Sequence, residues 1–150
     1  MKSSFTERDK NFLKTNLFPI LSNPKIIAEI GNYTGTSTKF FSEELPDVKL
    51  YSVDIKKQKL GNLNKNVEVV IKNSLDWIPP ERLDFIYLDG DHSIDHVIKE
   101  INHFCNYTNI IAGHDAMIVK EALMHFLIQQ EIKLNLLITN TCSSWIATFD

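Results

Sequence analysis

A short apolar run followed by a glycine-containing turn, residues 26–38, constrains the fold of this chain more than any other stretch. Residues 26–30 (IIAEI) are rich in β-branched side chains, which predicts a parallel strand covered on both faces. Gly31 and Gly35 then allow a tight turn that a ligand can approach closely. Residues 36–38 (TST) favour a helix N-terminus, whose backbone N–H groups can bind a carboxylate or a phosphate. The stretch therefore predicts a nucleotide-type cofactor site.

The spacing of the two glycines bears on which cofactor is bound. Dinucleotide-binding folds use G-x-G-x-x-G, and the third glycine is missing here, which weakens the interpretation as an NAD site. Residues 29–37 (EIGNYTGTS) resemble motif I of the class I S-adenosylmethionine (SAM) dependent methyltransferases, especially the small O-methyltransferases. An ordinary strand, turn and helix with two glycines is the alternative interpretation.

Length and composition favour one domain of ordinary size. The chain has 150 residues, which is enough to bury a core, and we expect residues 1–22 to form an N-terminal helix and linker and residues 23–150 the Rossmann-like core. The net charge of -3 argues against a large nucleic-acid interface. No stretch has the pattern of a signal peptide or a membrane span, so we expect a cytoplasmic protein.

Predicted strands and helices alternate along the chain. Ser4 and Glu7 have the spacing of a capping box, which predicts an N-terminal amphipathic helix. The predicted strands are residues 26–30, 48–53, 67–71, 83–88, 109–113, 134–139 and 145–149. Further helices are predicted at residues 36–45, 93–104 and 118–130.

This alternation predicts an α/β fold with a doubly wound, mostly parallel sheet. The last two strands are joined by a short turn, so they form an antiparallel hairpin, since a parallel pair would need a crossover. The resemblance to methyltransferases implies a seven-stranded sheet in the order 3-2-1-4-5-7-6. In such sheets ligands lie beyond the carboxyl ends of the strands, so polar residues at those ends are the candidates for function.

Acidic and polar residues end the second and third strands. Asp54 follows the second strand, where a carboxylate suits the vicinal diol of a ribose, although a helix cap is the alternative. After the third strand, the resemblance implies that Ser74, with Asn73 and Asp76, brackets the adenine; a plain turn is the alternative. The cofactor-binding residues predicted in this way are Glu29, Gly31, Asn32, Tyr33, Gly35, Ser37, Asp54, Asn73, Ser74 and Asp89.

Two clusters of acids and histidines end the fourth and fifth strands. The first is residues 89–92 (DGDH), and the second contains His114 and Asp115. The neighbouring positions of the first, fourth and fifth strands are expected to bring both clusters to one pocket. Carboxylate ligands favour Mg²⁺ or Mn²⁺, whereas the imidazole of His114 favours softer ions. Surface loops with capping Asp residues and solvated His residues are the alternative.

Residues 87–92 together with residues 113–115 are similar to the metal-dependent O-methyltransferases of the catechol and macrolide-sugar types. The resemblance implies that Asp89, His114 and Asp115 hold the metal and that His92 is the general base. Imidazole suits this task because its pKa lies near the working pH. His114 departs from the pattern, since the family usually has a carboxylate there.

Taken together, these features predict a SAM-dependent methyltransferase acting on a hydroxyl oxygen of a small molecule, with a divalent metal assisting. The amino-acid end of SAM is assigned to Glu29 and Ser37. The acceptor site is expected to be open or completed by a second subunit, as in a homo-oligomer. A catalytically inactive SAM-binding partner subunit and an NAD-linked oxidoreductase are the alternatives. His96, His103 and His125 are expected to be ordinary surface or boundary residues, and Trp77 and Trp145 to lie in or near the core.

Overall fold

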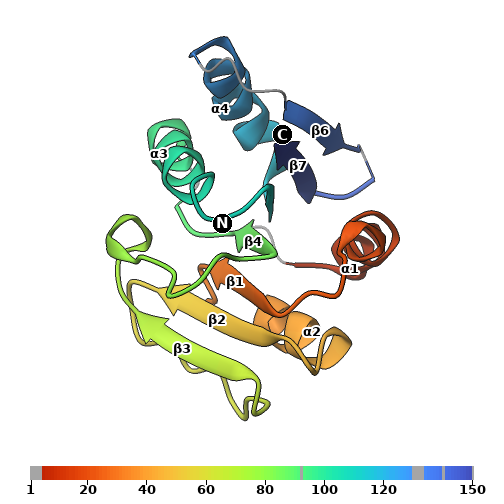
Figure 1. Cartoon of the computed structure of the whole chain (residues 1–150), viewed down its shortest axis with the longest axis vertical. Helices are drawn as coiled ribbons and strands as arrows, with labels where there is room; N and C mark the ends of the chain where they lie inside the picture. The colour runs from red at the N-terminus through yellow and green to blue at the C-terminus, as the bar shows by residue number, and fades with distance from the viewer. Residues whose placement is uncertain (1–4, 92, 130–133, 140, 150) are drawn as a thin grey trace.

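The computed structural model describes residues 5–91, 93–129, 134–139 and 141–149. In these residues one mixed sheet forms the centre of the molecule, with helices on both faces (Figure 1). The strands are β1 (Ile26–Ile30), β2 (Lys49–Asp54), β3 (Val67–Ile71), β4 (Phe85–Leu88), β5 (Ile110–Gly113), β6 (Leu134–Ile138) and β7 (Trp145–Phe149). The helices are α1 (Glu7–Asn16), α2 (Thr36–Glu44), α3 (Ile94–Phe104) and α4 (Ala116–Gln129), with short 3-10 helices at Phe18–Ile20 and Ser74–Asp76.

The order of the strands is β3-β2-β1-β4-β5-β7-β6, as predicted. The first five strands run parallel, and β7 pairs antiparallel with both β5 and β6. The doubly wound α/β sheet and its C-terminal antiparallel hairpin are therefore confirmed. Most of the predicted bounds lie within one or two residues of the observed ones.

Side chains of the strands alternate between two hydrophobic layers, one on each face of the sheet. Tyr87 and Ala112 belong to the layer that contains residues of α1 and α2. Ile86 and Ile111 belong to the layer that contains residues of α3 and α4. Two residues beyond Tyr87 and Ala112, Asp89 and His114 follow on the face that α1 covers. The alternation thus places two of the three predicted metal ligands, Asp89 and His114, on the side of the N-terminal helix.

The N-terminal helix begins at Glu7, and its capping box differs from the predicted one. Thr6 is the N-cap: its backbone N–H donates to Asp9 Oδ2 at 2.8 Å, and its hydroxyl oxygen accepts from the Asp9 N–H at 3.4 Å. The predicted pairing of Ser4 with Glu7 is therefore wrong, and Ser4 itself lies outside the described residues. The Asp9 carboxylate is only 1% exposed, because α1 packs this turn against the rest of the protein.

Glu29, a buried acid in β1, connects this strand with α2 and with β2. Glu29 Oε1 accepts a hydrogen bond from Ser37 Oγ of α2 at 2.6 Å, and Oε2 accepts one from Ser52 Oγ of β2 at 3.1 Å. Burial raises the pKa of Glu29 to about 7, although the hydrogen bonds from Ser37, Thr38 and Ser52 oppose the increase. Glu29 therefore fixes the start of α2 relative to β1 and β2.

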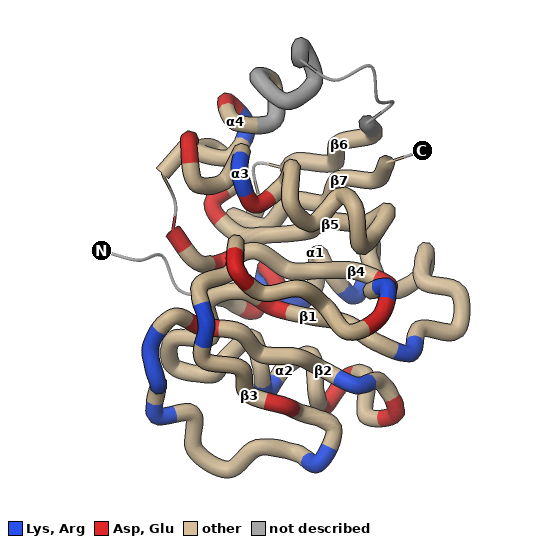
Figure 2. The backbone as a smooth tube through the Cα atoms, turned by 60° about the vertical axis from the view of Figure 1, so that its left-hand side comes forward, with Lys and Arg blue, Asp and Glu red and all other residues tan. Residues whose placement is uncertain are grey.

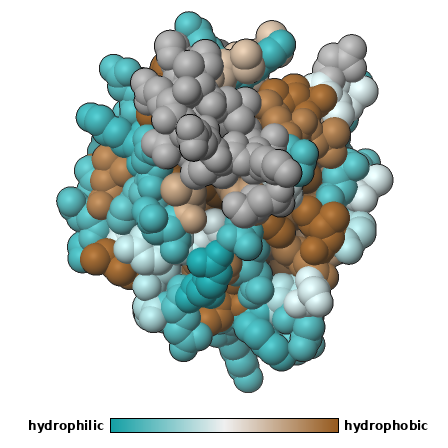
Figure 3. All heavy atoms as spheres, turned by 45° about the horizontal axis from the view of Figure 1, so that its top comes forward, coloured by the Kyte–Doolittle hydropathy of each residue, from teal (hydrophilic) through white to brown (hydrophobic). Residues whose placement is uncertain are grey.

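The surface of the described residues is mixed in charge and hydropathy. Basic and acidic positions are spread over helices, strand ends and loops (Figure 2). Brown apolar patches lie beside hydrophilic side chains on the end of the molecule seen in Figure 3. Met117, Ile118 and Met124 of α4 are among the exposed apolar residues. Within the described residues, no helix combines the length and the apolar character needed to cross a lipid bilayer.

The raised pKa of Glu29 predicts that the free energy of unfolding falls as the pH rises from about 4.5 to about 7. In that range the folded state holds a proton that the unfolded state has lost, so the stabilisation present below pH 4.5 disappears as the pH passes the folded-state pKa. Glu29→Gln should remove up to about 3 kcal/mol of this pH dependence. Urea denaturation at pH 5 and pH 8 measures it.

Glu81→Gln is the matched control, because Glu81 is exposed. It should retain the wild-type pH dependence. An equal change in the free energy of unfolding between pH 5 and pH 8 in the wild type and in Glu29→Gln would contradict the assignment of this titration to Glu29.

Candidate active site

A cavity of about 430 Å³ lies at the carboxyl ends of β1, β2, β3 and β4. This is where parallel α/β sheets bind their ligands. The predicted cofactor-binding residues that line it are Gly31, Tyr33, Asp54, Asn73 and Ser74. It is also lined by residues outside the predicted cofactor-binding set, among them Ile55, Lys72, His96 and Glu100, and by Gly90 and Asp91 of the DGDH cluster. The structure therefore brings five predicted residues from three strand ends into one cavity.

Asp54 connects the end of β2 with the glycine turn that follows β1. Its Oδ2 accepts hydrogen bonds from the backbone N–H groups of Asn32 at 3.1 Å and Tyr33 at 3.5 Å. Its Oδ1 accepts one from the N–H of Lys56 at 3.0 Å. Ionised carboxylate oxygens accept more than one hydrogen bond each, so the group retains acceptor capacity toward the cavity. Backbone donors thus hold Asp54 in an orientation suited to bind a diol.

Gly31 lets the end of β1 pass directly against the end of β4. Its φ is +84°, and a Cβ at this position would overlap the main-chain carbonyl of Asp89, whose carbon would be only 2.6 Å away. No side chain other than hydrogen fits here without moving backbone. The glycine turn and Asp89 are therefore in main-chain contact.

Other residues of the glycine stretch face the protein interior. Glu29 and Ser37 bond to each other, and Asn32 is 2% exposed and donates from Nδ2 to Ser52 Oγ at 3.0 Å. Gly35, with φ +83°, is the N-cap of α2 and lines a neighbouring cavity of about 520 Å³ next to α1. Direct contacts of these residues with a cofactor stay a prediction. In the structure these residues stabilise the turn and the start of α2.

A buried acid of α3 forms one wall of the cavity. Glu100 Oε1 accepts a hydrogen bond from Ser74 Oγ at 2.6 Å, and His96 Nε2 lies 3.0 Å from the same oxygen. Burial raises the pKa of Glu100, while Ser74 and His96 oppose the increase. His96 was expected to be an ordinary surface or boundary residue without a clear partner; it is half-buried, as a boundary residue is, but its contact with Glu100 shows that it has a partner. A sequence signal existed, since Glu100 falls on the apolar face of α3, between Val97 and Ile101.

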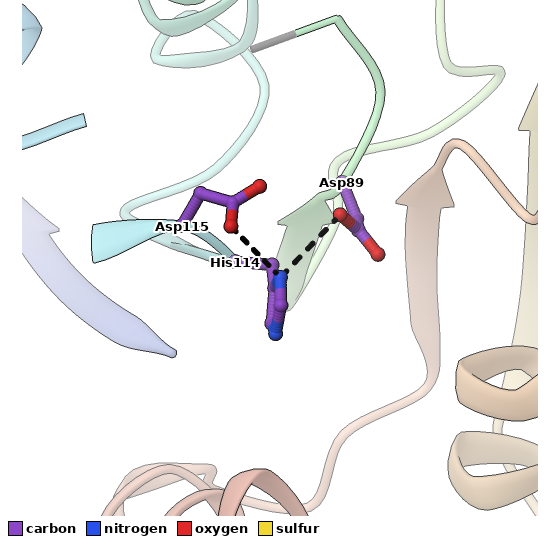
Figure 4. Close-up of side chains that lie close together, drawn as sticks. All are labelled: Asp89, His114 and Asp115. Carbon is purple, nitrogen blue, oxygen red and sulfur yellow. Dashed lines mark ion pairs between the residues drawn. The ribbon is translucent and has the colours of Figure 1, made fainter. Parts of the chain in front are cut away.

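The three predicted metal ligands lie at the ends of β4 and β5. Figure 4 shows Asp89, His114 and Asp115 converging, with dashed lines from the imidazole to both carboxylates. His114 Nδ1 is 3.5 Å from Asp115 Oδ1 and 3.8 Å from Asp89 Oδ1. Asp115 adopts a left-handed backbone conformation with φ +59°, which is costly for a residue other than glycine and is often found at functional sites. The three predicted metal ligands are thus brought together.

The opposite edge of the same imidazole contacts α1. His114 Nε2 lies 3.4 Å from Asp9 Oδ2, and Asp9 Oδ1 accepts a hydrogen bond from Ser144 Oγ at 2.8 Å. Tyr87 Oη lies 2.9 Å from Ser144 Oγ and must be the donor, because the serine proton is committed to the carboxylate. Sequence reasoning missed Asp9, since its partners lie more than 100 residues away.

Electrostatic effects in this network are large. Burial alone would raise the pKa of Asp9, but hydrogen bonds from His114, Thr6 and Ser144 hold it well below its usual range. Burial alone would lower the pKa of His114, but Asp115, Asp9 and Asp89 raise it to about 10. The network therefore strongly favours positive charge at the position of the imidazole.

The donor set fits a divalent cation. A metal-binding histidine usually donates its second ring N–H to a carboxylate, and Asp9 is placed to accept from Nε2 while Nδ1 faces Asp89 and Asp115. One ligand atom from each of Asp89, His114 and Asp115 lies within 4.8 Å of the others. One imidazole and two carboxylates suit Mn²⁺, Fe²⁺ or Zn²⁺ better than an all-oxygen site would.

The remaining candidates have varied outcomes. His92, the predicted general base, lies outside the described residues, as does the side chain of His125. His103 Nε2 lies 2.8 Å from the carbonyl oxygen of Trp77. Trp77 and Trp145 are buried, as predicted, and Trp145 Nε1–H donates to the carbonyl oxygen of His114 at 3.1 Å. The indole thus holds the backbone of the second cluster.

Comparison with solved structures identifies the fold among methyltransferases. The plantazolicin methyltransferase BpumL was solved with a desmethylPZN analogue and S-adenosyl-L-homocysteine (SAH). Its structure has a TM-score of 0.65 at 11% sequence identity, and the similarity covers 93% of this chain and 81% of that chain. The N-methyltransferase NodS from Bradyrhizobium japonicum WM9, solved with SAH, has a TM-score of 0.62 at 14% identity, covering 96% and 87%. A protein assigned as a caffeoyl-CoA O-methyltransferase from Staphylococcus aureus has a TM-score of 0.64 at 16% identity, covering 93% and 79%.

Comparison of the sequence itself gives the family. A search of curated proteins finds no match. A family profile described as "Methyltransferase domain" matches residues 28–116, more than half of the chain. The match begins within β1, the strand before the glycine turn. It ends at the first residue of α4, directly after Asp115. The chain belongs to this methyltransferase domain family.

Proposed function

We propose that this protein binds SAM in the cavity at the ends of β1–β4 and transfers its methyl group to an oxygen of a small molecule. The observation that carries the proposal is the placement of Asp54, which three backbone N–H groups orient at the wall of a cavity entered by the glycine turn. Family membership and SAH in the similar structures of BpumL and NodS support the choice of cofactor.

In this proposal the carboxylate of Asp54 accepts hydrogen bonds from the two ribose hydroxyls. The glycine turn at Gly31 and the loop at Gly90 border the cavity on the side of β4, so the reactive sulfonium lies toward Asp89. SAM itself supplies the electrophile, and the protein has to position the acceptor and prepare its oxygen.

The Asp89–His114–Asp115 group supports oxygen as the acceptor atom. The similar structures include both an N- and an O-methyltransferase, so fold likeness does not favour either acceptor. A divalent cation held by these three residues would lower the pKa of a bound hydroxyl by acting as a Lewis acid. Asp9 would keep the imidazole of His114 oriented. His92, next to this group in the sequence, is the proposed base.

Asp54→Asn tests the cofactor half of the proposal. The substitution keeps the shape of the side chain but removes the charge, so SAH affinity should fall by about 10-fold or more, as for the loss of a charged hydrogen bond. Isothermal titration calorimetry with SAH measures it. Asp47→Asn is the control, since Asp47 is exposed and lines a different cavity. SAH affinity equal to the wild type in Asp54→Asn would show that the cofactor is misplaced.

Metal binding tests the other half and needs no knowledge of the acceptor. After treatment with EDTA, the wild type should take up Mn²⁺ or Zn²⁺, as followed by calorimetry or by electron paramagnetic resonance of Mn²⁺. Asp115→Asn should weaken this binding by at least about tenfold. Asp95→Asn, on the exposed side of α3, should leave it unchanged. A wild type that binds neither ion would refute metal assistance and leave SAM binding to be judged by the titration with SAH.

A further inference from the structure

Glu100 is a charged residue that the fold buries at the cofactor cavity. It is 1% exposed and lies on the face of α3 that packs against the sheet, next to Val97 and Ile101. It nevertheless lines the cavity, together with Ser74 and His96. A buried carboxylate costs several kcal/mol unless it is hydrogen-bonded. The position therefore calls for an explanation beyond helix packing.

The hydrogen bonds of Glu100 occupy one of its two oxygens. Ser74 Oγ at 2.6 Å and His96 Nε2 at 3.0 Å both contact Oε1. These are the hydrogen bonds that the described residues make to the carboxylate, so Oε2 retains its acceptor capacity. Ser74 is anchored at the end of β3 and His96 lies one helical turn before Glu100, so the carboxylate is held in a fixed position. A fixed acceptor at a cavity wall is suited to recognise a donor on the ligand.

The place of this wall identifies the part of the ligand that meets it. Asp54, at the end of β2, takes the ribose in the proposed function, and β3 is the neighbour of β2 in the sheet. Ser74 follows β3, so the wall borders the side of the cavity beyond the ribose. Ile55 also lines the cavity and is 63% exposed, which offers an apolar surface for a planar base. The nucleobase is therefore the group nearest to Glu100.

The chemistry of the base completes the match. Adenine carries an exocyclic amino group, which donates hydrogen bonds, whereas hypoxanthine carries an oxygen at the same position, which accepts them. A carboxylate oxygen accepts from the amino group and repels the oxygen. A site built around a fixed acceptor therefore distinguishes the two bases strongly, because the wrong base leaves a buried polar group without a partner.

We propose that Glu100, held by Ser74 and His96, determines base specificity: its Oε2 accepts a hydrogen bond from the exocyclic amino group of the cofactor's adenine. The inference rests on the proposed SAM site and assigns to it a residue from α3. Ser74 then acts through Glu100, as a positioning residue, in addition to any direct contact with the base.

The test compares SAH with S-inosylhomocysteine, which differs in carrying hypoxanthine in place of adenine. Isothermal titration calorimetry on the wild type should give an affinity for SAH about 10- to 100-fold higher. In Glu100→Gln the amide can donate as well as accept, so the preference for SAH should fall to about threefold or less. Asp95→Asn, a change of acid to amide on the exposed side of the same helix, should keep the wild-type preference.

Each outcome separates this inference from the proposed function. Equal binding of the two ligands by the wild type would overturn the inference while leaving the SAM site in place, and so would an unchanged preference in Glu100→Gln. Binding of neither ligand would overturn the SAM site and the inference with it. The comparison on the wild type needs no variant, so equal binding of the two ligands would overturn the inference even where Glu100→Gln does not fold.

Discussion

The main-chain contact between Gly31 and Asp89 is the constraint on which the rest of the site depends. The N–H of Asp89 donates to the carbonyl oxygen of Ile30 at 2.8 Å, and Gly31 has no side chain that could separate the two strands. The glycine turn that borders the cavity and Asp89 are therefore fixed relative to each other by backbone alone. A cofactor in the cavity and an acceptor bound near Asp89 would therefore be held in a fixed position relative to each other.

Buried polar side chains that bond to one another lie on two sides of this contact. On one face of the sheet, Asp9 connects α1 with His114 and with Ser144, which precedes β7. On the other side of the cavity, Glu100 connects α3 with the end of β3 through Ser74. Low dielectric surroundings strengthen such hydrogen bonds and make an unmade one costly. The two networks thus attach α1 and α3, which lie far apart in the sequence, to the same site.

The sequence predicted the fold closely because its signals are local and consistent. The apolar runs have strand length, the apolar residues of α3 recur with a 3.6-residue period, and the last two strands leave no room for a crossover. The same local signals located Asp54 and the pair of clusters at Asp89 and at His114. Residues at strand ends could be predicted because parallel strands bring their carboxyl ends to one edge.

What the sequence did not predict depends on tertiary contacts. Ser4 with Glu7 and Thr6 with Asp9 both have capping-box spacing, and packing of Asp9 against Ser144, 135 residues away, accompanies the second choice. Glu100 was visible only as a charged residue on an apolar helix face, and its partner Ser74 lies 26 residues away. Pattern within a window of a few residues contains no information about such pairs.

A SAM site in the cavity beside Gly31 and Asp54 would couple cofactor binding to the stability of the folded protein. A thermal unfolding experiment with SAM, SAH and NAD side by side tests it most directly, because a ligand that binds the folded state alone raises the melting temperature. We expect increases in the melting temperature with SAM and SAH that grow with ligand concentration, and none with NAD. An increase with NAD alone, or no increase with either SAM or SAH, would contradict the proposed SAM site.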